Sequence, residues 1–186
     1  MRPHHIRDIL FQPEQLQERV AALFGEIRPV LQSDHPVMIA ILRGSFMFFA
    51  DLVRYSAGLY RHPQIDFTAL ESYGSGTVSA GRVRMGRDFT VDVRDADVLL
   101  VDDILDTGRT LSFAREHILQ KGACSVSTCV LLDKPARRVS PIEADFVGFR
   151  IPDHFVVGYG LDYDHHYRDL PYIARVTFTE PEQGAG

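Results

Sequence analysis

The sequence predicts an α/β protein in which a mostly parallel, twisted β-sheet is flanked by helices. Short apolar runs alternate along the chain with segments whose apolar residues recur at helical spacing, and this alternation is typical of parallel sheets. The chain has 186 residues, 45% of them hydrophobic and 24% charged, which is the balance of an ordinary globular protein. We therefore expect residues 1–179 to form a single domain, followed by a disordered polar tail at 180–186.

Three helices are expected, over residues 13–31, 46–55 and 110–120. In the first two, apolar side chains recur every three or four positions, so that each helix would bury one face. The third is followed by Gly122, at a position where glycine commonly ends a helix.

Strands are expected where short apolar runs lie between turn residues, at 37–42, 65–70, 97–104, 125–132, 146–149 and 155–159. The run at 97–104 is the clearest of them. The segment 72–86 is rich in glycine and small polar residues, which favours a mobile loop or hairpin tip. Because ligands bind outside the carboxyl ends of the strands in such sheets, the functional residues are expected there.

Composition excludes several classes of protein. Twenty basic and twenty-five acidic side chains give a formal charge of −5, which disfavours nucleic acid and leaves small molecules as the expected partners. Two cysteines, Cys124 and Cys129, are too few for a disulfide framework or a structural zinc site. The apolar runs fall far short of the ~20 residues of a membrane helix, and we expect a soluble, cytoplasmic protein.

The segment from Val98 to Leu111 carries the clearest functional signal. Three carboxylates within five positions follow an apolar strand, and a Thr-Gly-Arg-Thr turn then opens a helix. Such a helix start offers free backbone N–H groups to a phosphate, and Gly108 lets the backbone approach it closely. Asp102 and Asp103 would repel a phosphate, so we expect them to face hydroxyl groups or a metal ion. A sugar phosphate satisfies both halves; the alternative, helix capping, needs one aspartate rather than three.

This segment resembles the phosphoribosyl pyrophosphate signature of the type I phosphoribosyltransferases. The segments at 42–45, 72–74, 131–135 and 145–171 are similar to the hypoxanthine-guanine branch, and the resemblance extends over residues 5–178 in the family's order. It implies the fold of that family, with a small hood region and a flexible lid loop at 72–86. It also implies transfer of the 5-phosphoribosyl group from phosphoribosyl pyrophosphate to N9 of a 6-oxopurine, hypoxanthine and/or guanine.

The resemblance implies roles for four carboxylates. Asp106 would be the catalytic general acid/base beside purine N7. Asp102 and Asp103 would bind the ribose hydroxyls directly or through Mg²⁺, and Asp162 would be a further magnesium ligand. Asp102 stands where many relatives carry glutamate, so both a direct and a water-bridged contact with ribose stay open.

The phosphate groups would be bound by two loops and by Arg168. The pyrophosphate would meet Arg43 and Gly44, with a non-proline cis peptide before Arg43, and also Arg168. The 5′-phosphate would be held by Thr107, Gly108, Arg109 and Thr110, the last of which is also a candidate helix cap. Ser72 and Tyr73 would belong to the closing lid; the alternative for this segment is an ordinary disordered loop.

The base would be read by three further residues. Lys134 would donate to the 6-oxo group, which favours 6-oxopurines over adenine because adenine presents an amino group there. Phe155 would stack on the base, and the Val156 backbone would contact its edge. A lysine before proline can equally be a solvated turn residue, and a single phenylalanine is ordinarily core.

Several expectations and open questions remain from the sequence. A phosphoribosyl pyrophosphate-sensing, RNA-binding regulator is the alternative function on the same fold, although the basic residues are dispersed on an acidic chain. His165 and His166 are expected to be solvent-exposed rather than metal ligands. The family is usually dimeric or tetrameric, so a homo-oligomer is expected, and the sequence does not rank hypoxanthine, guanine and xanthine.

Overall fold

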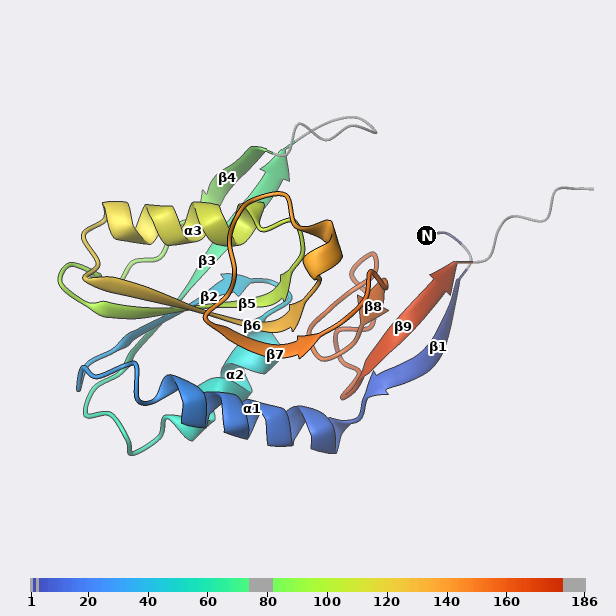
Figure 1. The fold of residues 1–186 in the computed structure, drawn as a ribbon, viewed down its shortest axis with the longest axis horizontal. Coiled ribbons are helices and arrows are strands. Elements are labelled where there is room, and N and C mark those ends of the chain that lie inside the picture. Colours follow the sequence, from blue (N-terminus) through green and yellow to red (C-terminus); the bar gives the residue numbers. More distant parts are fainter. Residues whose placement is uncertain (1, 3, 74–81, 179–186) are drawn as a thin grey trace, which may run out of the picture.

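The computed structural model describes residues 2, 4–73 and 82–178 (Figure 1). The centre of the predicted lid, 74–81, and the predicted tail, 180–186, lie outside the described residues. In chain order the elements are β1 (His4–Phe11), α1 (Pro13–Ile27), β2 (Val37–Leu42), α2 (Phe46–Tyr55), β3 (Gln64–Tyr73), β4 (Arg82–Arg87), β5 (Asp97–Leu105), α3 (Arg109–Gln120), β6 (Ser125–Asp133), the 3-10 helix η1 (Pro135–Arg137), β7 (Phe146–Arg150), β8 (Val156–Val157) and β9 (Ile173–Phe178).

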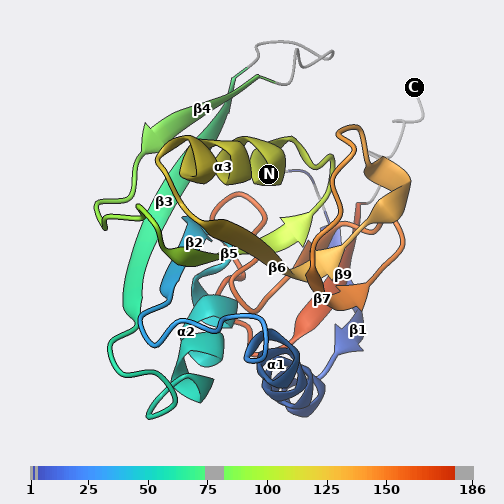
Figure 2. The ribbon, with the colours of Figure 1, turned by 60° about the vertical axis from the view of Figure 1, so that its left-hand side comes forward.

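Six strands form the main sheet in the order β4-β3-β2-β5-β6-β7. All neighbouring pairs are parallel except β3 and β4, which are antiparallel. Figures 1 and 2 show α3 on one face of this sheet and α1 and α2 on the other. The predicted α/β class, a mostly parallel sheet flanked by helices, is confirmed.

The central strands are apolar along their length because helices cover both faces. In β2, Met38 and Ala40 belong to the core beneath α1 and α2, whereas Ile39 and Ile41 belong to the core beneath α3. Burying each of the larger side chains contributes roughly 1.5–3 kcal/mol. The chain leaves β2 towards one edge of the sheet and β5 towards the other. The carboxyl ends of β2 and β5 therefore flank a topological switch point, where ligands bind in open α/β sheets.

A second, three-stranded antiparallel sheet has the order β1-β9-β8. It corresponds to the hood region that the resemblance implies. The sequence did not indicate β1 or β9, because β1 is exposed along much of its length and its apolar residues do not alternate. Pairing between these two strands, from His4 opposite Phe178 to Phe11 opposite Ile173, stabilises both.

Two predicted boundaries were wrong, whereas the hairpin alternative for the segment 72–86 is supported. Helix α1 ends at Ile27 rather than residue 31, although the helical apolar spacing continues to Leu31, which is buried in the turn that follows. The segment 72–86 contains strand at both ends, because β3 runs to Tyr73 and pairs with β4 as a hairpin, which agrees with the hairpin alternative. The strand expected at 155–159 is limited to Val156–Val157, since the backbone turns left-handed at Gly158.

No helix within the described ranges is long and apolar enough to cross a membrane. Cys124 is exposed and Cys129 is buried, and both are free thiols. That residues 1–179 form one domain stays a prediction.

Candidate functional site

Two adjoining cavities open at the carboxyl ends of the strands. The first, called the loop cavity, has a volume of ≈ 440 Å³ and is lined by Arg43, Gly44, Asp102, Asp103, Asp106, Thr107, Gly108, Arg109 and Thr110 among others. The second, called the hood cavity, has a volume of ≈ 470 Å³; it shares Arg43, Gly44, Asp103 and Asp106 with the first and adds Lys134, Phe155, Val156, Asp162 and Arg168. Every predicted site residue therefore lines one cavity or both, apart from Ser72 and Tyr73, whose side chains lie outside the described part.

The loop before α3 forms one wall of the loop cavity. Gly108 adopts a left-handed backbone with φ of 84°, and it is the N-cap of α3 without a side-chain cap. A Cβ at Gly108 would lie 2.7 Å from Ile142 Cγ2, so both the conformation and the space require glycine. Thr110 lies inside the helix, so the expectation that it caps α3 was wrong. The uncapped helix start leaves backbone N–H groups and the positive end of the helix dipole available to an anion.

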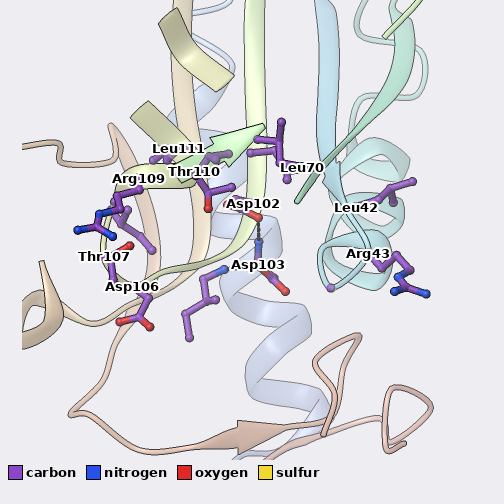
Figure 3. A pocket seen from close by; sticks show the side chains of 16 residues that line it. Leu42, Arg43, Leu70, Asp102, Asp103, Asp106, Thr107, Arg109, Thr110 and Leu111 are labelled. Carbon is purple, nitrogen blue, oxygen red and sulfur yellow. Dashed lines mark hydrogen bonds between the residues drawn. The ribbon is translucent and has the colours of Figure 1, made fainter. Parts of the chain in front are cut away.

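The end of β5 places Asp102 and Asp103 at the floor between the two walls (Figure 3). The Asp103 N–H donates to Asp102 Oδ1 at 3.0 Å, and the Ile104 N–H donates to Asp103 Oδ1 at 2.8 Å. Burial raises the pKa of Asp102 well above its usual range, and the charge of Asp103 raises it further. Burial also raises the pKa of Asp103, against hydrogen bonds and the positive charge of Arg168. The pair is therefore a strong acceptor for a cation or for hydroxyl donors.

Asp102→Asn is expected to raise the melting temperature of the ligand-free protein at pH 7 by about 2–4 °C, or roughly 1 kcal/mol. A carboxyl group whose pKa is raised by folding lowers the stability as pH rises above its ordinary value of 3.8, because the folded state then binds more protons than the unfolded one. Asparagine removes this cost and keeps the acceptor for Asp103 N–H. Thermal unfolding at pH 7 and near pH 4 tests this: the gain should shrink at the lower pH, and a lower melting temperature at pH 7 would contradict the expectation.

The loop after β2 forms the opposite wall, and Figure 3 shows Arg43 across the cavity from Asp106 and Thr107. The peptide bond between Leu42 and Arg43 is cis, as the resemblance implies. The next residue, Gly44, lies against β5: a Cβ added there would be 1.5 Å from Asp103 Oδ2. No other residue type fits at position 44 with Asp103 in its present position.

The hood cavity contains a buried ammonium group at the end of β6. The side chain of Lys134 is 8% exposed, and its Nζ lies 3.8 Å from Asp153 Oδ1. Burial lowers the pKa of Lys134, and the negative charges of Asp106 and Asp153 oppose that effect. Phe155 is 42% exposed in the same cavity, and its ring contacts Tyr163 and Phe178 edge to face. The hood cavity therefore offers a charged hydrogen-bond donor and an exposed aromatic ring to a ligand.

Asp162 does not join the other two predicted magnesium ligands. Its carboxylate pairs with Arg168 Nη2 at 2.8 Å, and Arg168 also donates to the Gly160 carbonyl at 2.7 Å. Residues 2, 4–73 and 82–178 contain no cluster of three or more candidate metal ligands. Asp102 and Asp103 fit magnesium because Mg²⁺ commonly takes one or two carboxylates and completes its shell with water and substrate oxygens.

The sequence reasoning missed two residues of the site. Arg137 lines the hood cavity, and its Nε lies 3.0 Å from Asp106 Oδ1. Arg138 donates from Nη1 to the Asp106 carbonyl at 2.7 Å. The run Lys-Pro-Ala-Arg-Arg after a buried strand was the available signal. His165 and His166, in contrast, are exposed as expected.

Comparison with known proteins agrees with this geometry. Residues 8–164 match the model of the phosphoribosyl transferase domain. The chain is 42% identical over 173 residues to the hypoxanthine-guanine phosphoribosyltransferase of Bacillus subtilis (strain 168), which spans 93% of this chain and 94% of that protein. It is 40% identical over 183 residues to the hypoxanthine phosphoribosyltransferase of Haemophilus influenzae, which spans 97% of this chain and 100% of that protein.

A solved structure gives the same result for the fold. The crystal structure of a hypoxanthine-guanine phosphoribosyltransferase from Bacillus anthracis, with a HEPES molecule in its active site, matches with a TM-score of 0.86 at 42% identity and covers 93% of this chain and 100% of that one. Since sequence and fold agree over nearly the whole chain, the protein belongs to the phosphoribosyl transferase family and, within it, to the hypoxanthine-guanine phosphoribosyltransferases.

Proposed function

We propose that this purine-salvage enzyme transfers the 5-phosphoribosyl group from phosphoribosyl pyrophosphate to N9 of hypoxanthine and/or guanine, giving IMP and/or GMP and pyrophosphate. The observation that carries this proposal is the joining of the two cavities at Asp103 and Asp106. An anion-binding loop lies on one side of the junction, and an ammonium group beside an exposed aromatic ring lies on the other. A sugar at the junction would present its phosphate to the first cavity and its anomeric carbon to a base in the second.

The chain's residues would serve the reaction chiefly by position and charge. The bond from C1′ to pyrophosphate breaks as the bond from N9 to C1′ forms, and the ribose carries positive charge between the two events. Asp102 and Asp103 would hold the ribose hydroxyls, and the loop from Thr107 to Thr110 would hold the 5′-phosphate. The base gives up a proton as it becomes the nucleotide, and the Asp106 carboxylate would receive it.

The departing pyrophosphate would lie among Arg43, the Gly44 backbone and Arg168, which supply fixed positive charge and donors. Mg²⁺ is the proposed cofactor, and when bound it would neutralise charge on the pyrophosphate oxygens. Asp102 and Asp103 would hold one magnesium ion on the ribose side, and Asp162, which lies apart from them, would hold a second ion on the hood side. Closure of the lid that includes Ser72 and Tyr73 would keep water from the ribosyl cation.

The first test is a panel of bases assayed for pyrophosphate release. We expect turnover with hypoxanthine, guanine or xanthine in the presence of magnesium, little with adenine or uracil, and loss of turnover with a chelator. The panel also ranks the three 6-oxopurines. Absence of turnover with every base, together with tight RNA binding, would contradict the proposal and favour the regulator.

Lys134→Met is expected to lower kcat/KM for the 6-oxopurine by about 10–100-fold, as for loss of a hydrogen bond from a charged group. Methionine keeps most of the buried volume, so the melting temperature should change little. Lys121→Met is the matched control, because Lys121 pairs with Asp88 at the end of α3, outside both cavities. A collapse of the melting temperature in Lys134→Met would instead indicate a structural role.

We also propose a homo-oligomer, dimeric or tetrameric, that acts in the cytoplasm without nucleic acid or membrane partners. Exposed apolar side chains of α2 and β3 support the homo-oligomer: Phe46, Ile65 and Phe67 are 38%, 42% and 36% exposed. Burial of such side chains between subunits is favourable. The two free thiols fit a reducing compartment.

A further inference from the structure

We propose that Arg137 and Asp153 are positioning residues that hold Asp106 and Lys134 apart, so that the base rather than an internal ion pair occupies the space between them. The proposal rests on the base-reading roles proposed above for Asp106 and Lys134. In addition to those roles, Arg137 and Asp153 would keep the base site open.

The four side chains form a row of alternating charge. Arg137 Nε lies 3.0 Å from Asp106 Oδ1, and Arg137 Nη1 lies 3.3 Å from Asp153 Oδ1. The same oxygen of Asp153 lies 3.8 Å from Lys134 Nζ. Each of the two base-reading groups therefore has a counter-ion of its own. Asp106, Lys134 and Arg137 also line the hood cavity.

Without Asp153, Asp106 would be the main negative charge acting on Lys134. The two already interact, since the Asp106 carboxylate is the main charge that raises the pKa of Lys134 against the effect of burial. Within the described residues, however, they form no ion pair at 4.0 Å or less. In a partly buried cavity the attraction between unpaired opposite charges is only weakly screened. A direct pair would close the gap in which the purine edge has to fit.

The backbone fixes both counter-ions relative to the groups they hold. Arg137 ends η1, which begins directly after Lys134 at Pro135, and its N–H donates to the Lys134 carbonyl at 3.2 Å. Asp153 lies in the loop after β7, where the Ile151 N–H donates to the Asp133 carbonyl at 2.9 Å. The Asp153 carboxylate thus bridges the turn that carries Lys134 and the loop that leads to Phe155. The row of charges links the acid, the ammonium group and the stacking ring of one base site.

This arrangement has a specific kinetic consequence. If Asp106 and Lys134 pair with each other, the base binds only to the fraction of molecules in which that pair is open, so the apparent affinity for the base falls by that fraction. Of the four residues in the row, only Asp106 lines the loop cavity, and the loop from Thr107 to Thr110 lies outside the row. The affinity for phosphoribosyl pyrophosphate should therefore be retained. A general disturbance of the fold would instead lower the apparent affinity for both substrates.

The test is steady-state kinetics of Arg137→Met and Asp153→Asn with each substrate varied in turn. We expect the KM for hypoxanthine to rise by about 10-fold or more in Arg137→Met while the KM for phosphoribosyl pyrophosphate changes less than about 2-fold. Asp153→Asn should raise the KM for hypoxanthine by a smaller factor. Arg137→Lys should recover part of the loss, because it keeps the charge but not the planar guanidinium. Arg137 has a side chain that is 48% exposed, so folding should survive these changes.

Two further variants make the result decisive. Arg150→Met is the control, because Arg150 is 75% exposed, pairs with Asp133 at 3.6 Å and lies outside the hood cavity; both KM values should stay at the wild-type level. In an Asp106→Asn background, Arg137→Met should raise the KM for the base no further, since the charge that would compete with the base for Lys134 is already absent and Lys134 keeps only its pairing with Asp153. An equal rise in both KM values, or independent effects in that background, would overturn the inference.

Failure of the inference is distinguishable from failure of the proposed function. If Asp106→Asn and Lys134→Met leave the kinetics with the base unchanged, the assignment of those two residues is wrong. If both impair the reaction and Arg137→Met has no effect on the KM for the base, only the role given to Arg137 and Asp153 is wrong.

Discussion

Gly44→Ala is expected to lower kcat/KM by at least about 10²-fold, the size of loss that follows when a catalytic group is displaced by about 1 Å. The new methyl group would lie 1.5 Å from Asp103 Oδ2 and 2.7 Å from Asp103 Cγ, so the Asp103 carboxylate has to leave its position. The backbone of Gly44 is not left-handed, and alanine adopts it without strain. The loss should therefore appear in steady-state kinetics with both substrates, with only a small change in melting temperature.

Gly25→Ala is the matched control for this variant. Gly25 lies in α1, and a Cβ added there would meet no atom within 4 Å. Alanine should leave activity unchanged and stabilise the helix by up to about 1 kcal/mol. Because the effect of Gly44→Ala passes through Asp103, it should add little to the loss caused by Asp103→Asn. Normal activity in Gly44→Ala would show that the reaction does not need Asp103 in its present position.

Asp106→Asn is expected to reduce turnover by about 10–10⁴-fold while leaving the binding of phosphoribosyl pyrophosphate largely intact, as for loss of a proton-transfer group. Asparagine has nearly the same shape, but it does not take up a proton. Turnover with hypoxanthine and isothermal titration with phosphoribosyl pyrophosphate measure the two effects separately.

Asp95→Asn supplies the control for this change of charge. Asp95 is exposed, lies before β5 at the end of the sheet opposite the site, and has a φ of 57°, which asparagine tolerates well. Its activity should equal that of the wild type. An unaltered rate in Asp106→Asn would reject the role of Asp106 as general acid/base.

The elements that sequence reasoning located well carry strong local patterns. Both bounds of β2 were predicted correctly, and those of β5 and β6 to within one residue, because an unbroken apolar run between turn residues is typical of a buried strand. Both bounds of α2 were also correct, because its apolar residues recur at helical spacing and it buries one face. The strands β1 and β9 were missed because partners far away in the sequence stabilise them. No local pattern carries that information.

The candidate site likewise has a part that the sequence predicted and a part that it did not. The segment around Asp102 to Thr110 is contiguous, so residue order alone predicted a strand end, an acidic pair and an anion-binding helix start. The contacts of Arg137 with Asp106 and Asp153 join three separate segments. The contact of Gly44 with Asp103 likewise depends on β2 lying beside β5. Such contacts follow from topology, which a single sequence specifies only indirectly.

The pairing of β1 with β9 also bears on the order in which the two cavities are completed during synthesis. During translation, every strand of the main sheet has its neighbours once Arg150 has emerged. Strand β1 can pair only after β9 has been synthesised, because His4 lies opposite Phe178. Contacts between residues this distant in sequence also form slowly. Phe178 is also one of the rings behind Phe155. A nascent polypeptide arrested before Ile173 would thus carry the loop proposed to bind phosphate, but Phe155 would have only Tyr163 beside it and would lack Phe178.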